Sequence, residues 1–179
     1  MARSRSSLAF RLEFLFYLTN LDIIFIIKTV IALALPYHPN RLNALHAPLI
    51  QDLLELAQAS KQDCVNKIIG MLEDFHVHGF QKDARGAYAC RFIKPFGGAI
   101  YELKAKKVPS GAARVYLIRG NDQCAYLTHA ECKSQNAANQ WMIANTLEIQ
   151  DALEQNIAVF PAAQQIQHLE RIQKILEDL

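Results

Sequence analysis

Apolar residues recur at helical spacing in two stretches between Asn40 and Gly79, and these stretches predict two consecutive core-facing helices. In the first stretch Asp52 lies off the apolar face, which is formed by Leu42, Leu45, Leu49, Leu53 and Leu56. A proline is tolerated in a first turn, so the regular part of this helix is expected to begin at Pro48. In the second stretch Ser60 is the expected N-cap and Gly79 the expected stop. The two stretches together predict a helical hairpin.

After Gly79 the helical period is replaced by short runs of β-branched, aromatic and aliphatic residues, which predict strands. The runs cover residues 87–93, which is the weakest, 99–107, 112–119 and 123–129. Pro109-Ser110-Gly111 and Gly120-Asn121-Asp122 supply tight turns between the last three runs. Strands joined by such short loops run antiparallel. The pattern therefore predicts a small antiparallel sheet of three or four strands.

Helical spacing returns after the strand-like runs. Residues 136–153 predict a helix that covers the sheet, with Trp141 as its anchor in the core. Residues 162–179 predict a last, amphipathic helix, with Ile166, Leu169, Ile172 and Leu176 at spacings of three or four. The order of elements predicts an α+β fold with a helical hairpin, an antiparallel sheet, a covering helix, and extra helices at the N- and C-termini.

Residues 12–35 form an apolar run that follows three arginines and is long enough to span a bilayer. Asp22 and Lys28 lie inside this run, and each charge is costly at the centre of a membrane helix. Three interpretations stay open: a membrane tether, an extra helix packed on the domain, or a segment translated from an upstream start that adds no function. Pro36 ends the run in each case. The expected organisation is an apolar segment (1–36), a central domain (37–155) and a C-terminal amphipathic helix (156–179).

Charge and cysteine content add little to the predicted fold, apart from a cationic region in the middle of the chain. The formal net charge is +2, which by itself does not indicate a nucleic-acid-binding protein. Between residues 82 and 119, however, nine basic residues stand against two acidic ones, so the middle of the chain is cationic. The four cysteines form no Cys-x-x-Cys pair, which favours a reduced, cytoplasmic protein without a zinc site. No motif predicts a metal ion or another cofactor.

Short motifs follow one another in a definite order from about Val65 to Leu153. They are Lys94-Pro95 before a glycine pair, Tyr101-Glu102-Leu103-Lys104, Arg114-Val115-Tyr116, and Leu127-Thr128-His129 with Lys133 following. In this order the chain resembles RelE/HigB-type toxins of the RelE/ParE superfamily, which show a YELR-like strand, an RV-aromatic strand and an LLHxFxKK-like strand end before a final helix. The chain departs from this pattern at Lys104, where arginine is usual, and at Glu131-Cys132-Lys133, where a more basic and apolar run is usual.

The resemblance implies the toxin of a type II toxin-antitoxin pair, a metal-independent endoribonuclease that cleaves mRNA, at the ribosome if it follows its family. Such cleavage needs a base for the 2′-hydroxyl, cations for the phosphorane, an acid for the leaving 5′-oxygen, and alignment. Arg114 is the expected phosphate clamp and Lys104 a second cation. Glu102 is expected on the same strand face as Lys104, as a base or as the ion-pair partner of Arg114. Histidine titrates near neutrality, so His129 is the expected acid or base.

RNA-binding candidates surround these residues. Lys133 is expected to hold the RNA backbone, and Tyr101 or Tyr116 to stack on a base. Lys106 and Lys107 are further candidates, and their simpler interpretation is a solvated turn. Without the resemblance, the catalytic candidates would be interpreted as a structural cross-strand ion pair and a hydrogen-bonded histidine at a strand end.

The expected partners are a cognate antitoxin, which would cover the basic face of the toxin, and mRNA, on the ribosome or free. A membrane would be contacted only through residues 12–35, and the expected location is otherwise the cytoplasm. Two alternatives stay open. One is a ParE-like toxin that inhibits DNA gyrase by surface contact and does not need the Lys104, Arg114 and His129 cluster. The other is a catalytically inactive protein of the toxin fold whose terminal helices serve assembly.

Overall fold

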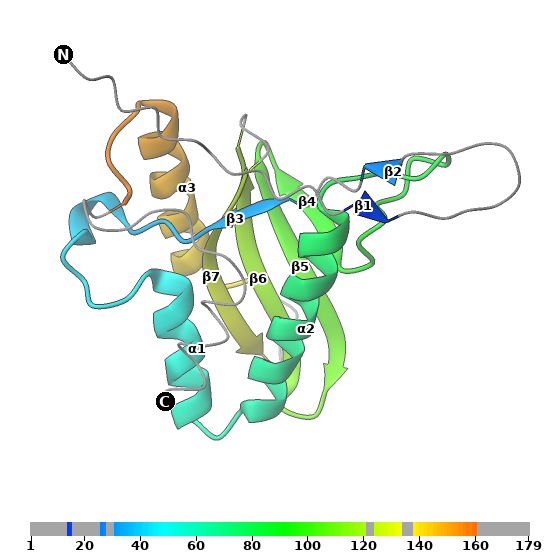
Figure 1. The fold of residues 1–179 in the computed structure, drawn as a ribbon. Coiled ribbons are helices and arrows are strands. Elements are labelled where there is room, and N and C mark those ends of the chain that lie inside the picture. Colours follow the sequence, from blue (N-terminus) through cyan, green and yellow to red (C-terminus); the bar gives the residue numbers. More distant parts are fainter. Residues whose placement is uncertain (1–13, 16–25, 28–30, 121–123, 134–137, 161–179) are drawn as a thin grey trace, which may run out of the picture. The chain divides into compact units, whose positions relative to one another are not determined.

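The computed structural model describes residues 14–15, 26–27, 31–120, 124–133 and 138–160. The chain divides into two compact units, Met1–Val30 and Ile31–Leu179. In the first unit, two short strands pair antiparallel: β1 (Phe14–Leu15) and β2 (Ile26–Ile27). All the other described elements belong to the second unit (Figure 1).

A five-stranded sheet forms the centre of the second unit, with the strand order β3-β7-β6-β5-β4. Its strands are β3 (Ala32–Ala34), β4 (Ile93–Gly97), β5 (Ile100–Val108), β6 (Gly111–Arg119) and β7 (Cys124–Lys133). β4 to β7 run antiparallel to their neighbours, as the short turns predicted, whereas β3 pairs with β7 in parallel. The sheet is therefore one strand larger than the prediction allowed.

The added strand, β3, comes from the end of the apolar run at residues 12–35. Leu33 and Ala34 point to opposite faces of this strand and are both buried, so its sequence shows no alternation of apolar and polar residues. A strand covered on both sides has a continuous apolar sequence, which periodicity does not distinguish from a buried helix. Two of the interpretations of residues 12–35, the membrane tether and the packed extra helix, expected a helix there. That expectation is wrong for the residues of β1, β2 and β3, which are strands.

No helix in the described part of the chain combines the length and apolarity needed to cross a membrane.

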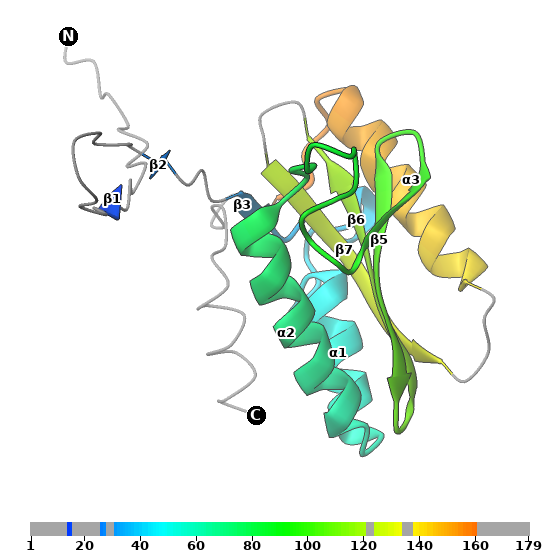
Figure 2. The same cartoon turned by 90° about the vertical axis from the view of Figure 1, so that its right-hand side faces the viewer.

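Helices cover both faces of the sheet, which Figure 2 shows in an edge-on view. α1 (Pro48–Gln58) and α2 (Gln62–His78) lie on one face, called the inner face here, and α3 (Gln140–Glu154) lies on the other, the outer face. This is a mixed α and β architecture with three helices of α type among the described residues, preceded by a 3₁₀ turn at Pro39–Arg41.

The helix boundaries confirm some predicted signals and correct others. Pro48 is in the first turn of α1, as expected, and Leu45 precedes the helix with 84% of its surface exposed, so its place on the apolar face was wrong. Gly79 ends α2 with φ of 52°, a left-handed conformation that costs glycine little. Ser60 is not the N-cap, because α2 begins after Lys61 and that residue makes no side-chain cap bond.

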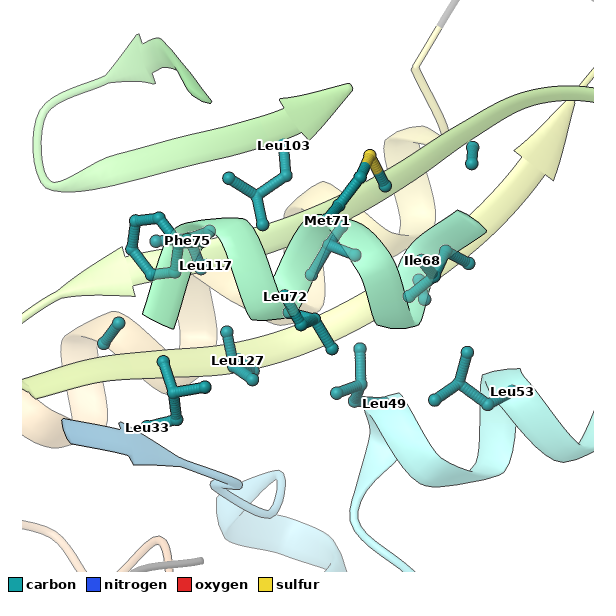
Figure 3. Packing of buried hydrophobic residues seen from close by; sticks show 14 of the residues in the cluster. Leu33, Leu49, Leu53, Ile68, Met71, Leu72, Phe75, Leu103, Leu117 and Leu127 are labelled. Atoms are coloured by element: carbon teal, nitrogen blue, oxygen red, sulfur yellow. The ribbon is translucent and has the colours of Figure 1, made fainter. Parts of the chain in front are cut away.

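The inner core packs leucines and other large apolar side chains from α1 and α2 against the sheet (Figure 3). Its fully buried members include Leu49, Leu53, Ile68, Met71, Leu72, Phe75, Leu103, Leu117 and Leu127. Burying each such side chain contributes about 1.5–3 kcal/mol, so this layer is the main source of stability. A disulfide between Cys64 of α2 and Cys132 of β7 also crosses it. The expectation of a fully reduced chain was wrong, because partners 68 residues apart leave no spacing signal.

The outer face has a smaller apolar core beneath α3. It joins Ile100 and Ile118 of the sheet to Ile149, Ala152 and Val159. Trp141, at the start of α3, is 53% exposed and so is not the core anchor that its size suggested. Beyond this small core, the outer face of the same strands carries charged and hydroxyl side chains instead of apolar ones.

Candidate functional site

Strand alternation sends the motif residues of β5 to opposite faces of the sheet. Leu103 and Tyr101 belong to the inner core, so Glu102 and Lys104 lie on the outer face. The predicted shared face of Glu102 and Lys104 is thereby confirmed.

Cross-strand pairing then assembles two neighbouring rows of polar residues on the outer face. In one row Lys104 of β5 is opposite Arg114 of β6, which is opposite Glu131 of β7. The other row runs through Lys94, Glu102, Tyr116 and His129 on β4 to β7. Residues directly opposite each other in antiparallel strands have Cβ atoms about 4.5–5.5 Å apart, so the rows bring residues distant in sequence within reach of one another.

His129 reaches this face through a β-bulge. Tyr116 pairs with His129 and Leu117 pairs with Leu127, so Thr128 is an extra residue on β7. Simple alternation from Leu127 in the inner core would have placed His129 on the inner face too. Because of the bulge, Thr128 and His129 both lie on the outer face. Thr128 contacts α3, with 2.8 Å between its Oγ1 and Oγ1 of Thr146, and His129 joins the outer rows.

Arg114 is the centre of a buried ionic network. Its Nη1 lies 3.2 Å from Oε1 of Glu102, its Nε lies 3.8 Å from Oε1 of Glu131, and only 2% of its surface is exposed. Lys133 Nζ approaches the other oxygen of Glu131 at 3.5 Å. Two cations therefore balance two carboxylates. Burial of such a network is costly and breaking one partner costs more, so the guanidinium is held firmly in place.

Tyr116 adds a proton donor to the network. Its hydroxyl donates to Oε1 of Glu131 at 2.7 Å. Burial raises the pKa of Tyr116, and the hydrogen bond to the Glu131 carboxylate raises it further. The hydroxyl therefore stays protonated at neutral pH, between the ionic row and His129.

His129 is oriented by a carboxylate from a different element, Asp52 of α1. Nδ1 of His129 lies 2.8 Å from Oδ2 of Asp52, and the same oxygen accepts the Ala130 backbone N–H at 2.8 Å. β3 is too short to pair with this part of β7, so Asp52 takes the place of a strand neighbour. An ionised carboxylate only accepts hydrogen bonds, so Nδ1 is the donor whenever Asp52 is ionised.

The second ring nitrogen of His129 is the atom left for chemistry. Nε2 is buried, and within the described ranges it has no hydrogen-bond partner. The imidazole also contacts the indole of Trp141, with ring centroids 5.3 Å apart. Burial raises the pKa of Asp52, and its hydrogen bond to His129 opposes that rise. The arrangement presents one defined nitrogen of His129 for proton exchange.

Several RNA-binding candidates do not join this site as predicted. Tyr101 packs in the inner core, its ring centroid 4.8 Å from that of Phe80, so the proposed stacking role is incompatible with its position. Tyr116 is on the outer face but is fully buried beneath other groups. Lys106 is exposed near the β5–β6 turn, apart from the two rows, and Lys107 lies in the same strand.

Sequence reasoning missed Asp52 and Glu131 as members of the site. Asp52 was expected off the apolar face of its helix, but only 8% of it is exposed, so that placement was wrong. It is three residues after Leu49 and four before Leu56, so helical spacing was a usable signal. Glu131 was noticed only as a departure from the RelE/HigB pattern. Its pairing opposite Arg114 depends on the bulge at Thr128, which has no sequence signature here.

The described residues contain no group of three or more histidine, cysteine, aspartate or glutamate side chains arranged to hold a metal ion. No protein-family model matches the sequence, and no curated protein is significantly similar to it.

Proposed function

We propose that this chain is a RelE/HigB-like toxin whose second unit is a metal-independent endoribonuclease that cleaves mRNA. One observation supports this most strongly: Glu102, Arg114 and His129, from three different strands, lie in adjacent cross-strand rows on one face. A cation, a carboxylate and an oriented imidazole in one place supply the groups that phosphodiester transfer requires.

The geometry supports a division of roles. His129 Nε2 takes the proton of the 2′-hydroxyl, and the 2′-oxygen then attacks phosphorus. Arg114 stabilises the charge of the phosphorane, with Lys104 of the same row as a second cation. Glu102 holds the Arg114 guanidinium, with 3.2 Å between their atoms, which favours an ion-pair role for Glu102 over that of a base. Tyr116 is kept protonated by its raised pKa and donates to Glu131, so the leaving 5′-oxygen takes up the proton that His129 removed from the 2′-hydroxyl. The products are a 2′,3′-cyclic phosphate and a 5′-hydroxyl.

The second candidate is a binding protein of the same fold without nuclease activity, either ParE-like or inactive. Its supporting observation is burial, because Arg114 and His129 are each only 2% exposed. A nuclease with this site must expose it before a phosphate can reach Arg114. A purely structural network needs no such opening.

The remaining proposals come from the sequence pattern and from the resemblance. The pattern favours a helical hairpin formed by α1 and α2 and an extra C-terminal helix. The resemblance implies a cognate antitoxin that covers the basic face, action at the ribosome, and a cytoplasmic location. The expected C-terminal helix at residues 162–179 lies outside the described residues, as does most of the apolar segment at 1–36.

Induced expression in bacteria separates the two candidates. We expect growth arrest with new mRNA 5′-ends for the wild type, and neither effect for Arg114→Lys or His129→Gln, which retain polar groups of similar size. Circular dichroism of each purified variant controls for folding. Arrest with intact mRNA in all three chains would favour the binding protein.

A further inference from the structure

Two large aromatic side chains are exposed at opposite ends of the outer polar rows. Phe96 on β4 is 44% exposed and Trp141 on α3 is 53% exposed. Each ring touches a buried member of the site. The Phe96 ring centroid is 6.2 Å from that of Tyr116, and the Trp141 ring centroid is 5.3 Å from that of His129. Because Tyr116 and His129 are cross-strand partners, the two exposed rings flank one continuous row.

Neither ring belongs to the two apolar cores formed by the described residues. Trp141 does not anchor α3, whose buried residues are Thr146, Ile149 and Ala152. Phe96 occupies the irregular position of β4, between Pro95 and Gly97, where the pairing with β5 shifts. Alternation along β4 places Phe96 on the outer face with Lys94, and bulges such as this one are frequent beside functional sites.

Lysines lie on the same face as the two rings. Lys94 is opposite Glu102, and Lys104 is opposite Arg114, so both share the outer face. Lys133 is next to Glu131 on the same side, with its side chain about one-third exposed. The carboxylates near them are buried, whereas the lysines reach solvent. The accessible side chains of the strands on this face are therefore aromatic and cationic, whereas α3 exposes the acidic residues Glu148, Asp151 and Glu154.

We propose that Phe96 and Trp141 are a platform on which unpaired RNA bases stack, with Lys94, Lys104 and Lys133 holding the phosphates between them. Flat aromatic surfaces interleaved with cations are the usual means of binding single-stranded nucleic acid. The inference rests on the proposed function, since it places the substrate strand across the row that contains Tyr116 and His129. It transfers the stacking role from Tyr101 and Tyr116, which are buried, to two residues that are exposed.

A protein partner would use this surface differently. It would match the rings with apolar side chains, and the three lysines would stay near the rim with acidic partners. An RNA strand uses both features together, because each nucleotide brings a base and a phosphate. The presence of two exposed rings and three lysines on one face favours RNA.

The chain contains a single tryptophan, so the fluorescence of Trp141 reports directly on this surface. The probe is a short, unpaired 2′-O-methyl RNA, which lacks the 2′-hydroxyl nucleophile and cannot be cleaved. We expect it to quench Trp141, and the same strand in a duplex to quench far less. The salt dependence of binding should have a log–log slope near −2, from about −0.7 for each of three phosphate contacts.

Phe96→Leu is the decisive variant, because leucine keeps the apolar surface and removes the ring. We expect it to weaken RNA binding by about 5- to 150-fold, the range for losing one base–aromatic stack. Leu45→Ala, at an exposed leucine outside the outer face, is the matched control and should bind as the wild type does. Lys94→Gln should lower the salt slope by about 0.7.

The outcomes separate this inference from the nuclease proposal. Quenching that Phe96→Leu reduces, in a protein that never cleaves RNA, would support the platform and refute the nuclease. Cleavage of ordinary RNA with no quenching, or with Phe96→Leu binding equal to the wild type, would overturn the platform. Tight binding of an acidic, apolar peptide in place of RNA would also overturn it.

Discussion

The two faces of the sheet are built from alternate residues of the same strands and follow different rules. On the inner face, Leu103 and its neighbours pack against α1 and α2 without a polar partner. On the outer face, Glu102 and Arg114 are almost as deeply buried, yet they are charged. Apolar burial stabilises a fold in proportion to its area, whereas a buried ionic network is close to neutral at best. The inner face therefore supplies most of the stability, and the outer face is where the proposed chemistry would take place.

Among the variants that test this contrast, Arg114→Met should have the largest effect. It leaves the carboxylates of Glu102 and Glu131 buried without their main cation, so we expect a loss of about 3–5 kcal/mol in the free energy of unfolding. Replacing all three residues together, as Arg114→Met with Glu102→Leu and Glu131→Leu, should restore most of that stability. Urea unfolding measures both changes.

RNA cleavage must be abolished in the single and in the triple variant, although only the single variant is unstable. A triple variant that is both stable and active would show that the network has no part in the chemistry.

On the inner face, Leu103→Ala should lower stability and leave cleavage unchanged, the opposite of the result expected for the triple variant. The residue lies directly between Glu102 and Lys104 but is fully buried in the apolar core, so its truncation should cost about 2–5 kcal/mol. Cleavage measured well below the unfolding temperature should stay close to that of the wild type. Leu147→Ala on the exposed side of α3 is the control, with an expected change within about 0.5 kcal/mol. If Leu103→Ala is folded but has lost cleavage activity, the assignment of stability to the inner face and of cleavage to the outer face is contradicted.

Asp52→Asn tests how much the negative charge of Asp52 contributes to the action of His129, and its expected effect is smaller. The amide oxygen can replace Oδ2 and accept from both His129 and the Ala130 N–H, so the geometry is retained and only the charge is lost. We expect cleavage to fall by about 10- to 100-fold, as for other residues that orient a functional side chain. Asp52→Ala, which removes the acceptor as well, should be worse, and equal activity in all three proteins would refute the orienting role.

The same variant makes a prediction for pH. The folded-state pKa of Asp52 is raised by burial, so the folded protein holds this proton more tightly than the unfolded chain does. The protonated form of Asp52 therefore adds to the free energy of unfolding. This contribution is fully present below the ordinary aspartate pKa and is lost as the pH rises through the raised pKa of the folded protein. Urea unfolding at several pH values should show that loss in the wild type and not in Asp52→Asn.

The inner face was largely predictable from the sequence, and the outer site only in part. Helical spacing located α1 and α2, and glycine and proline signals located the turns of the antiparallel strands, because local chemistry determines both. β3 was missed because a strand buried on both faces has no alternation. The shared face of Glu102 and Lys104 followed from alternation alone.

The rest of the site depended on contacts that no local pattern encodes. The bulge at Thr128 moves His129 and aligns Glu131 with Arg114, and the short β3 lets Asp52 reach the edge of β7. The size of Trp141 suggested a buried anchor, but tertiary packing leaves the ring exposed. In each case a long-range arrangement overrode the local expectation.

The central claim is that His129 and Arg114 carry out RNA cleavage, and the most direct measurement is the chemistry of the cut ends. Purified protein, with and without ribosomes, is incubated with an unpaired RNA and with the same RNA carrying 2′-O-methyl groups. The account predicts 2′,3′-cyclic phosphate and 5′-hydroxyl ends from the first RNA only, with the rate reduced at least about 100-fold in His129→Gln. Cuts in the methylated RNA, an undiminished rate in His129→Gln, or no cleavage by the wild type under either condition would contradict it.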